Sequence, residues 1–118
     1  MGYEIRLFAV ERVSEDGYAS VVADIDLCKI GQGNLADLLH QSTPKKPKAY
    51  VFGLDGNRRF KKDRYDAPLS IMEVDDVIKA IEADNQREPY RRFELALATL
   101  KAFKIGFGED AKILGYGH

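Results

Sequence analysis

The sequence has few of the residues on which common catalytic and metal sites depend. It contains one cysteine, Cys28, and two histidines, His40 and His118. A single thiol can form neither an internal disulfide nor a zinc site of several thiolates, which favours a reducing compartment. In its apolar stretch, we expect Cys28 to be a small buried residue. One histidine ends a predicted helix and the other ends the sequence, so a Ser-His-Asp set lacks a well-placed base. No P-loop and no GxGxxG motif is present.

Long apolar runs are missing as well. Nothing in the sequence approaches the ~18 consecutive apolar residues that span a bilayer. Charged residues at positions 4, 6, 11 and 12 interrupt the apolar stretch that a signal peptide needs. We therefore expect a soluble, cytoplasmic protein without a membrane span. With 118 residues, 45 % hydrophobic and 31 % charged, the composition is typical of a globular chain, so we expect residues 1–118 to form a single α+β domain.

Alternating side chains predict a β-hairpin near the N-terminus. Residues 3–13 alternate at first: Tyr3, Ile5 and Leu7 share one face of an extended strand, and charged Glu4 and Arg6 take the other. Residues 18–27 alternate in the same way, and the SEDG sequence at 14–17 has the composition of a turn. We expect the two segments to pair as antiparallel strands.

The middle of the sequence predicts a short helix and a second hairpin. Asn34 is a good N-cap residue for a helix over about 35–41. Residues 49–54 predict a strand and residues 58–65 its partner, joined by a tight turn at 55–57.

The start of the next helix is open to two interpretations. Ser70 and Glu73 fit a capping box, in which each side chain bonds the other residue's backbone N–H, and this favours a helix beginning there. The alternative makes residues 69–74 a strand and Asp75 the cap.

The last part of the sequence predicts a third helix and a final strand. Pro89 suits the first helical position, and Gly106 or Gly108 suits the end of that helix. Residues 111–116 predict a strand. The order β-β-α-β-β-α-α-β is not the alternation of a parallel α/β fold, so we expect an α+β fold with a mostly antiparallel sheet and helices packed on one face.

Positive charge is concentrated between residues 45 and 64, which we call the basic segment. It holds eight basic and two acidic residues, a net charge of +6, so the rest of the chain carries −7 against a total of −1. Such a chain can attract anions at one face while staying near neutral overall. The basic residues are Lys45, Lys46, Lys48, Arg58, Arg59, Lys61, Lys62 and Arg64.

The strand predicted over 58–65 allows two interpretations of the basic segment: it either binds an anionic partner or only keeps a sheet edge soluble. Positive charge on both of its faces suits an edge strand or a projecting β-ribbon. Basic residues around an aromatic side chain, Phe60, are also used to contact phosphates and stack bases. Arg87, Arg91 and Arg92 form a second, smaller cluster. The alternative is a solvated edge strand whose charges prevent aggregation between sheets.

The sequence YVFGLDGNRRFKK, residues 50–62, resembles the diphosphate-binding signature of the cis-prenyltransferases. It matches at Asp55, Gly56, Asn57, Arg59 and Phe60. The resemblance implies that Asp55 would help hold magnesium and diphosphate and that Arg59 would bind the phosphate. The alanine after the aromatic residue and the downstream arginine-serine motif are missing, and those enzymes are much longer than 118 residues. We therefore interpret the match as convergence and assign no catalytic residue from it.

Asp24 and Asp26 are the candidate metal ligands. They lie two residues apart on a predicted strand, so their carboxylates point to one face, where they could hold a hard divalent cation. Further ligands would be needed for a phosphodiester hydrolase, and a polar sheet face explains the pair equally well.

These observations favour binding over catalysis. We expect a small interaction or regulatory protein, compatible with a homodimer and without a cofactor, whose basic β-ribbon binds an acidic protein surface or another polyanion. A nucleic-acid-binding accessory protein is the first alternative, and a metal-dependent hydrolase using Asp24 and Asp26 the second. The expected partner-binding residues are Lys45, Lys46, Lys48, Arg58, Arg59, Phe60, Lys61, Lys62 and Arg64.

Overall fold

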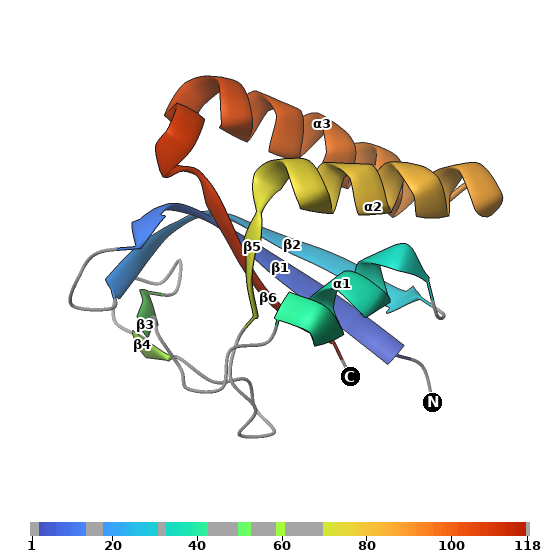
Figure 1. Ribbon diagram of the computed structural model, residues 1–118, viewed down its shortest axis with the longest axis horizontal. Helices are drawn as coiled ribbons and strands as arrows, with labels where there is room; N and C mark the ends of the chain where they lie inside the picture. Colours follow the sequence, from blue (N-terminus) through green and yellow to red (C-terminus); the bar gives the residue numbers. More distant parts are fainter. Residues whose placement is uncertain are drawn as a thin grey trace.

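A computed structural model describes residues 3–13, 18–30, 33–42, 50–52, 59–60 and 70–117. Within these residues, six strands form one sheet that three α-helices accompany (Figure 1). The elements are β1 (Tyr3–Val13), β2 (Tyr18–Ile30), α1 (Asn34–Ser42), β3 (Tyr50–Phe52), β4 (Arg59–Phe60), β5 (Ser70–Glu73), α2 (Val74–Arg87), α3 (Arg91–Phe107), the short 3-10 helix η1 (Gly108–Asp110) and β6 (Lys112–Gly117).

The strands lie in the order β4-β3-β2-β1-β6-β5. The pairs β1–β2, β1–β6, β3–β4 and β5–β6 are antiparallel, whereas β3 runs parallel to β2. The predicted α+β fold with a mostly antiparallel sheet is confirmed, and the observed order differs from the predicted one by the additional strand β5.

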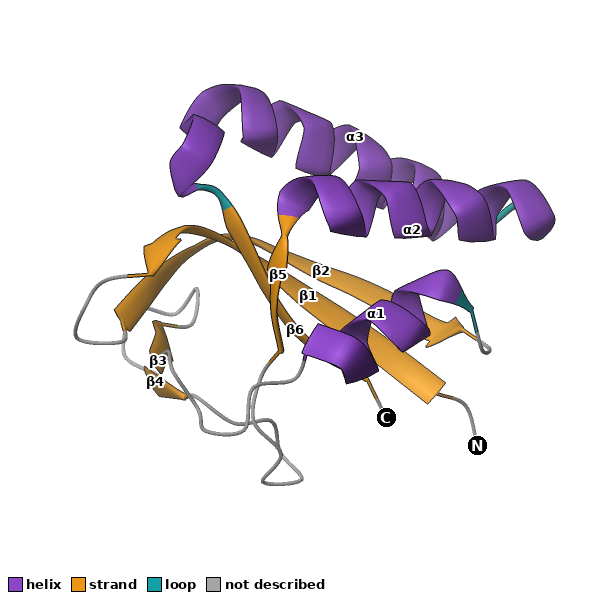
Figure 2. Cartoon of the chain, in the orientation of Figure 1, coloured by secondary structure: helices purple, strands orange, loops and turns teal. Residues whose placement is uncertain are grey.

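The three helices pack on one face of the sheet, as predicted (Figure 2). The core between them combines alternate residues of the central strands, such as Ile5, Leu7 and Ile113, with the inner faces of the helices, such as Ile81 and Leu100. All five side chains are completely buried. The alternation of residues 3–13 therefore predicted the core face of β1 correctly.

The other face of the sheet also carries buried apolar side chains. Phe8, Val10 and Leu114 lie on it and are at most 5 % exposed. Phe8 and Leu114 are directly paired across β1 and β6. Both faces of β1 are therefore withdrawn from water over residues 7–10, although the sequence predicted an apolar face only on the side of Ile5 and Leu7.

A bulge interrupts the β1–β2 pairing near Cys28. The register shifts between Glu4 and Arg6, and Cys28 has a φ of 55°, a conformation that favours glycine. Its N–H donates to Oδ1 of Asp26 at 2.7 Å, which stabilises the turn of the backbone. Cys28 is half-buried, so the expectation of a buried residue is wrong.

Side chains at the start of α3 satisfy the carbonyl groups beside this bulge. The Tyr90 hydroxyl donates to the Leu27 carbonyl at 2.9 Å, and Nη1 of Arg92 donates to the Asp26 carbonyl at 2.7 Å. Because a bulge disrupts the regular ladder, these bonds help to satisfy its backbone and fix α3 to β2.

An aspartate of α2 caps the N-terminus of α1. Asp84 is 3 % exposed, and its carboxylate accepts the backbone N–H groups of Asn34 at 2.7 Å and Leu35 at 3.0 Å. The guanidinium of Arg87 lies 3.6 Å from the same carboxylate. A negative charge is favourable here because these N–H groups have no partner inside the helix. At Gly33, an added Cβ would lie only 2.7 Å from Oδ1 of Asp84, so the close approach requires glycine.

Two predicted helix starts are displaced by a residue or two. The carbonyl of Gly33 accepts the N–H of Asp37 at 3.1 Å, so the N-cap of α1 is Gly33 and not Asn34. Tyr90 is the N-cap of α3, which places Pro89 before the helix instead of at its first position. The predicted helix end is confirmed, because Gly108 follows α3 with a φ of 57°.

The predicted capping box is wrong. Residues 70–73 form β5, which pairs with β6, and α2 begins at Val74 with Glu73 as its N-cap and no side-chain capping bond. The alternative interpretation was right about the strand but wrong about Asp75 as the cap. Met72, 3 % exposed, pairs with Ile113 in the core, and burying it in the sheet outweighs a local cap.

None of the helices among the described residues is long and apolar enough to cross a bilayer.

Candidate functional site

The described part of the basic segment lies at one edge of the sheet. β4, with Arg59 and Phe60, is the last strand in the sheet order and pairs antiparallel with β3. Val51 lies opposite Phe60 and Phe52 opposite Arg59. In Figure 1, this strand pair is apart from α2 and α3. The predicted strand pair and its edge position are therefore confirmed over these residues.

Most of the expected partner-binding residues lie outside the described residues, as do the turn at 55–57 and the remainder of the predicted strand 58–65. The structure brings Arg59 and Phe60 to the sheet edge by their backbone positions. The expected partner-binding residues that lie outside the described residues are Lys45, Lys46, Lys48, Arg58, Lys61, Lys62 and Arg64.

The edge position of β4 follows from how β3 joins the sheet. β3 pairs in parallel with the start of β2, Tyr18 opposite Tyr50, and β4 then returns antiparallel along its outer side. Basic residues are common on edge strands because positive charge discourages further strand addition. The same charge lets an edge attract an acidic surface.

The two candidate metal ligands are engaged by groups of the chain itself. Asp24 accepts two hydrogen bonds from Arg6, from Nε to Oδ1 at 2.8 Å and from Nη2 to Oδ2 at 2.6 Å. This bidentate ion pair neutralises the negative charge of the Asp24 carboxylate. Oδ1 of Asp26 accepts the N–H of Cys28. A cation at Asp24 would have to compete with the guanidinium that the carboxylate already binds. Among the described residues, no group of three or more His, Cys, Asp or Glu side chains lies close enough to hold a metal ion.

The three arginines of the smaller cluster, Arg87, Arg91 and Arg92, lie in three different environments. Arg87 lies beside the carboxylate of Asp84, and Arg92 donates to the β2 carbonyl of Asp26. Arg91 is exposed in the first turn of α3. Two of the three therefore have evident structural roles.

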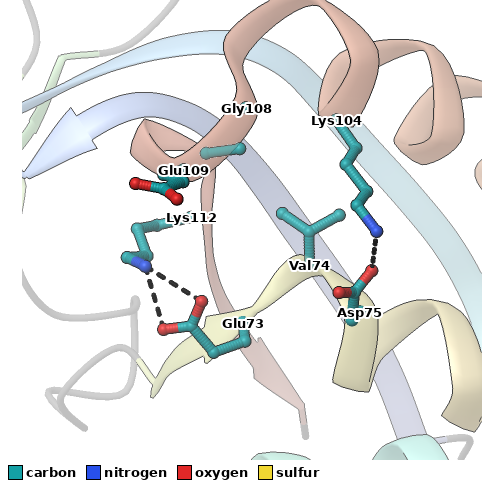
Figure 3. Close-up of a pocket in the computed structure, with 8 residues that line it drawn as sticks. Glu73, Val74, Asp75, Lys104, Gly108, Glu109 and Lys112 are labelled. Carbon is teal, nitrogen blue, oxygen red and sulfur yellow. Dashed lines mark hydrogen bonds and ion pairs between the residues drawn. The ribbon is translucent and has the colours of Figure 1, made fainter.

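A pocket of about 470 Å³ lies where β5 meets α2, facing the end of α3 (Figure 3). Two ion pairs border it, Lys104 with Asp75 and Lys112 with both oxygens of Glu73 at 2.9 Å. No local pattern in the sequence indicates this pocket, because Glu73 and Lys112 become neighbours only through the β5–β6 register. Since both lysines are paired, the pocket offers no clear preference for an ionic ligand.

Comparison with known proteins adds no assignment: no protein-family model, curated protein or solved structure matches the chain.

Proposed function

We propose that this chain is a non-catalytic interaction protein that binds an acidic protein surface through its basic segment. The edge position of β4 is the observation that carries the proposal. A charged segment that continues from the last strand of a sheet can reach a partner without opening the core, which lies between the helices and the central strands.

The distribution of charge supports the same proposal. The basic segment carries +6 and the remainder of the chain −7. A partner with an acidic surface would be attracted to the segment and repelled by the rest of the protein, which orients the encounter. This attraction should weaken with salt, because the Debye length falls from ~30 Å at 0.01 M to ~8 Å at 0.15 M ionic strength.

An acidic protein is favoured over nucleic acid by the overall balance of charge. The chain as a whole carries −1, whereas a dedicated nucleic-acid binder usually has a broad basic surface that follows the phosphate backbone. A local patch is sufficient for an acidic protein surface of limited extent.

The test compares two variants that change the net charge equally. Lys61→Glu with Lys62→Glu alters the basic segment without changing β4, whereas Lys79→Glu with Lys101→Glu alters exposed positions on α2 and α3. Fluorescent polyglutamate serves as the acidic probe, and binding is followed by fluorescence anisotropy at low and moderate salt.

We expect the chain to bind polyglutamate at low salt, and the segment variant to bind about tenfold or more weakly while the helix variant stays within about twofold. Absence of binding at low salt, or equal losses in both variants, would overturn the proposal. Markedly tighter binding to a random single-stranded oligonucleotide, with the steep salt dependence of phosphate contacts, would replace the acidic protein with nucleic acid as the partner.

A further inference from the structure

The outer face of α3 carries exposed apolar side chains at coiled-coil spacing. Leu95, Ala98, Ala102 and Ile105 follow one another at intervals of three, four and three residues. At about 100° per residue they occupy an arc of about 80° on the helix. All four are exposed, Leu95 by 63 % and Ile105 by 87 %.

This arc lies opposite the side of α3 that enters the core. The core side is formed by Phe93, Ala96, Leu100 and Phe103. α3 is therefore apolar on two opposite sides, whereas a helix at the surface of a protein normally has one apolar stripe and a polar outer face. In Figure 1, α3 runs along the top of the molecule, with the sheet below it. The core does not explain the outer stripe.

We infer that the outer stripe of α3 is the interface of a homodimer in which the two α3 helices pack antiparallel. The spacing is that of alternating a and d positions, which form the seam between two helices. With the two-fold axis near the middle of the helix, Leu95 of one copy meets Ile105 of the second, and Ala98 meets Ala102. The alanines let the helix axes approach closely, and the larger residues close both ends of the contact.

The charges at the two ends of α3 favour an antiparallel orientation, and they favour a second copy of this chain as the partner of the outer stripe. Arg91 and Arg92 begin the helix, and Glu109 and Asp110 follow its end in η1. All four residues are exposed. An antiparallel pair brings each basic start beside an acidic end, twice in the dimer, whereas a parallel pair would bring like charges together. Antiparallel helix dipoles add to this preference.

The first test measures association. Sedimentation velocity of the full chain from about 1 μM to 1 mM covers the affinities of small interfaces. Ile105→Glu places a charge in the seam, and Ala83→Glu on the exposed side of α2 is the matched control. We expect a concentration-dependent dimer that Ile105→Glu weakens by about tenfold or more and that Ala83→Glu leaves unchanged within about twofold. Circular dichroism checks that both variants keep the fold.

The second test concerns orientation and occupant. Arg91→Glu and Glu109→Arg should each weaken the dimer about threefold or more, and the double variant should recover most of the loss, because the exchanged charges again complement each other across the two-fold axis. A chain that stays monomeric to 1 mM overturns the inference. So does a dimer that Ile105→Glu leaves intact, because it must use another surface, and so does a double variant weaker than either single one, because the ends then do not meet.

Discussion

At the scale of single residues, Asp84 links two helices that are distant in the sequence. It is the buried charged side chain of the described core, and it accepts bonds from N–H groups fifty residues earlier. Its charge lies at the positive end of α1, where the orphan N–H groups of the first turn replace the water that burial removes. The residue therefore fixes where α1 docks on α2.

Removing this carboxylate should destabilise the protein more than removing an exposed one. We expect Asp84→Ala to lower the free energy of unfolding by about 2–4 kcal/mol, because the backbone N–H groups of Asn34 and Leu35 and the side-chain amide of Asn34 lose a charged acceptor. Glu82→Ala, two residues away on the exposed side, should cost about 0.5 kcal/mol or less. Urea unfolding measures both, and equal effects would contradict the capping role.

The neighbouring glycine should depend on the same carboxylate. An added Cβ at Gly33 would lie 2.7 Å from Oδ1 of Asp84 and 2.8 Å from Nη2 of Arg87. Because Asp84 is held by its bonds to α1, we expect Gly33→Ala to cost about 1–3 kcal/mol. The same substitution in the Asp84→Ala background should cost at least about 1 kcal/mol less. Additive effects in this double-mutant cycle would show that the crowding lies elsewhere.

At the scale of elements, local patterns predicted most strands and helices, and failed where distant pairing decided the outcome. The alternation in residues 3–13 and the glycine that ends α3 needed no distant partner, and the structure contains both features. Ser70 and Glu73 have a helix-capping pattern, yet they lie in β5, because Met72 is buried by pairing with β6 more than forty residues later in the chain. The Asp84 cap and the parallel β2–β3 pairing were unpredictable for the same reason.

The two apolar sides of α3 should respond differently to truncation. Leu100 is completely buried and Leu95 is 63 % exposed. We expect Leu100→Ala to lower the free energy of unfolding by about 2–5 kcal/mol through the lost transfer energy and the cavity. At a concentration where the chain is monomeric, Leu95→Ala should cost under about 1 kcal/mol. Thermal and urea unfolding of dilute samples measure both, and a large loss for Leu95→Ala would mean that it packs within the monomer.

At the scale of the whole molecule, the protein separates its apolar core from its concentrated charge. The helices and central strands form the core. The described strands of the basic segment, β3 and β4, lie at one edge of the sheet. The sequence predicted this edge because both faces of the segment are charged. The sequence alone did not indicate the face of α3 proposed to meet a second copy, because that face is recognised only by contrast with the side that enters the core. A two-fold dimer would carry two basic segments, and a partner able to reach both would bind more tightly by avidity.

Locating the binding surface is the most direct test of the proposed function. Amide ¹H–¹⁵N spectra of the labelled full chain, titrated with polyglutamate at low salt, report which backbone groups meet the probe. We predict shifts in residues 45–64, including Arg59 and Phe60 of β4, that become much smaller at the same polyglutamate concentration in Lys61→Glu with Lys62→Glu. Shifts concentrated on α2 and α3, or no shifts at all, would contradict it.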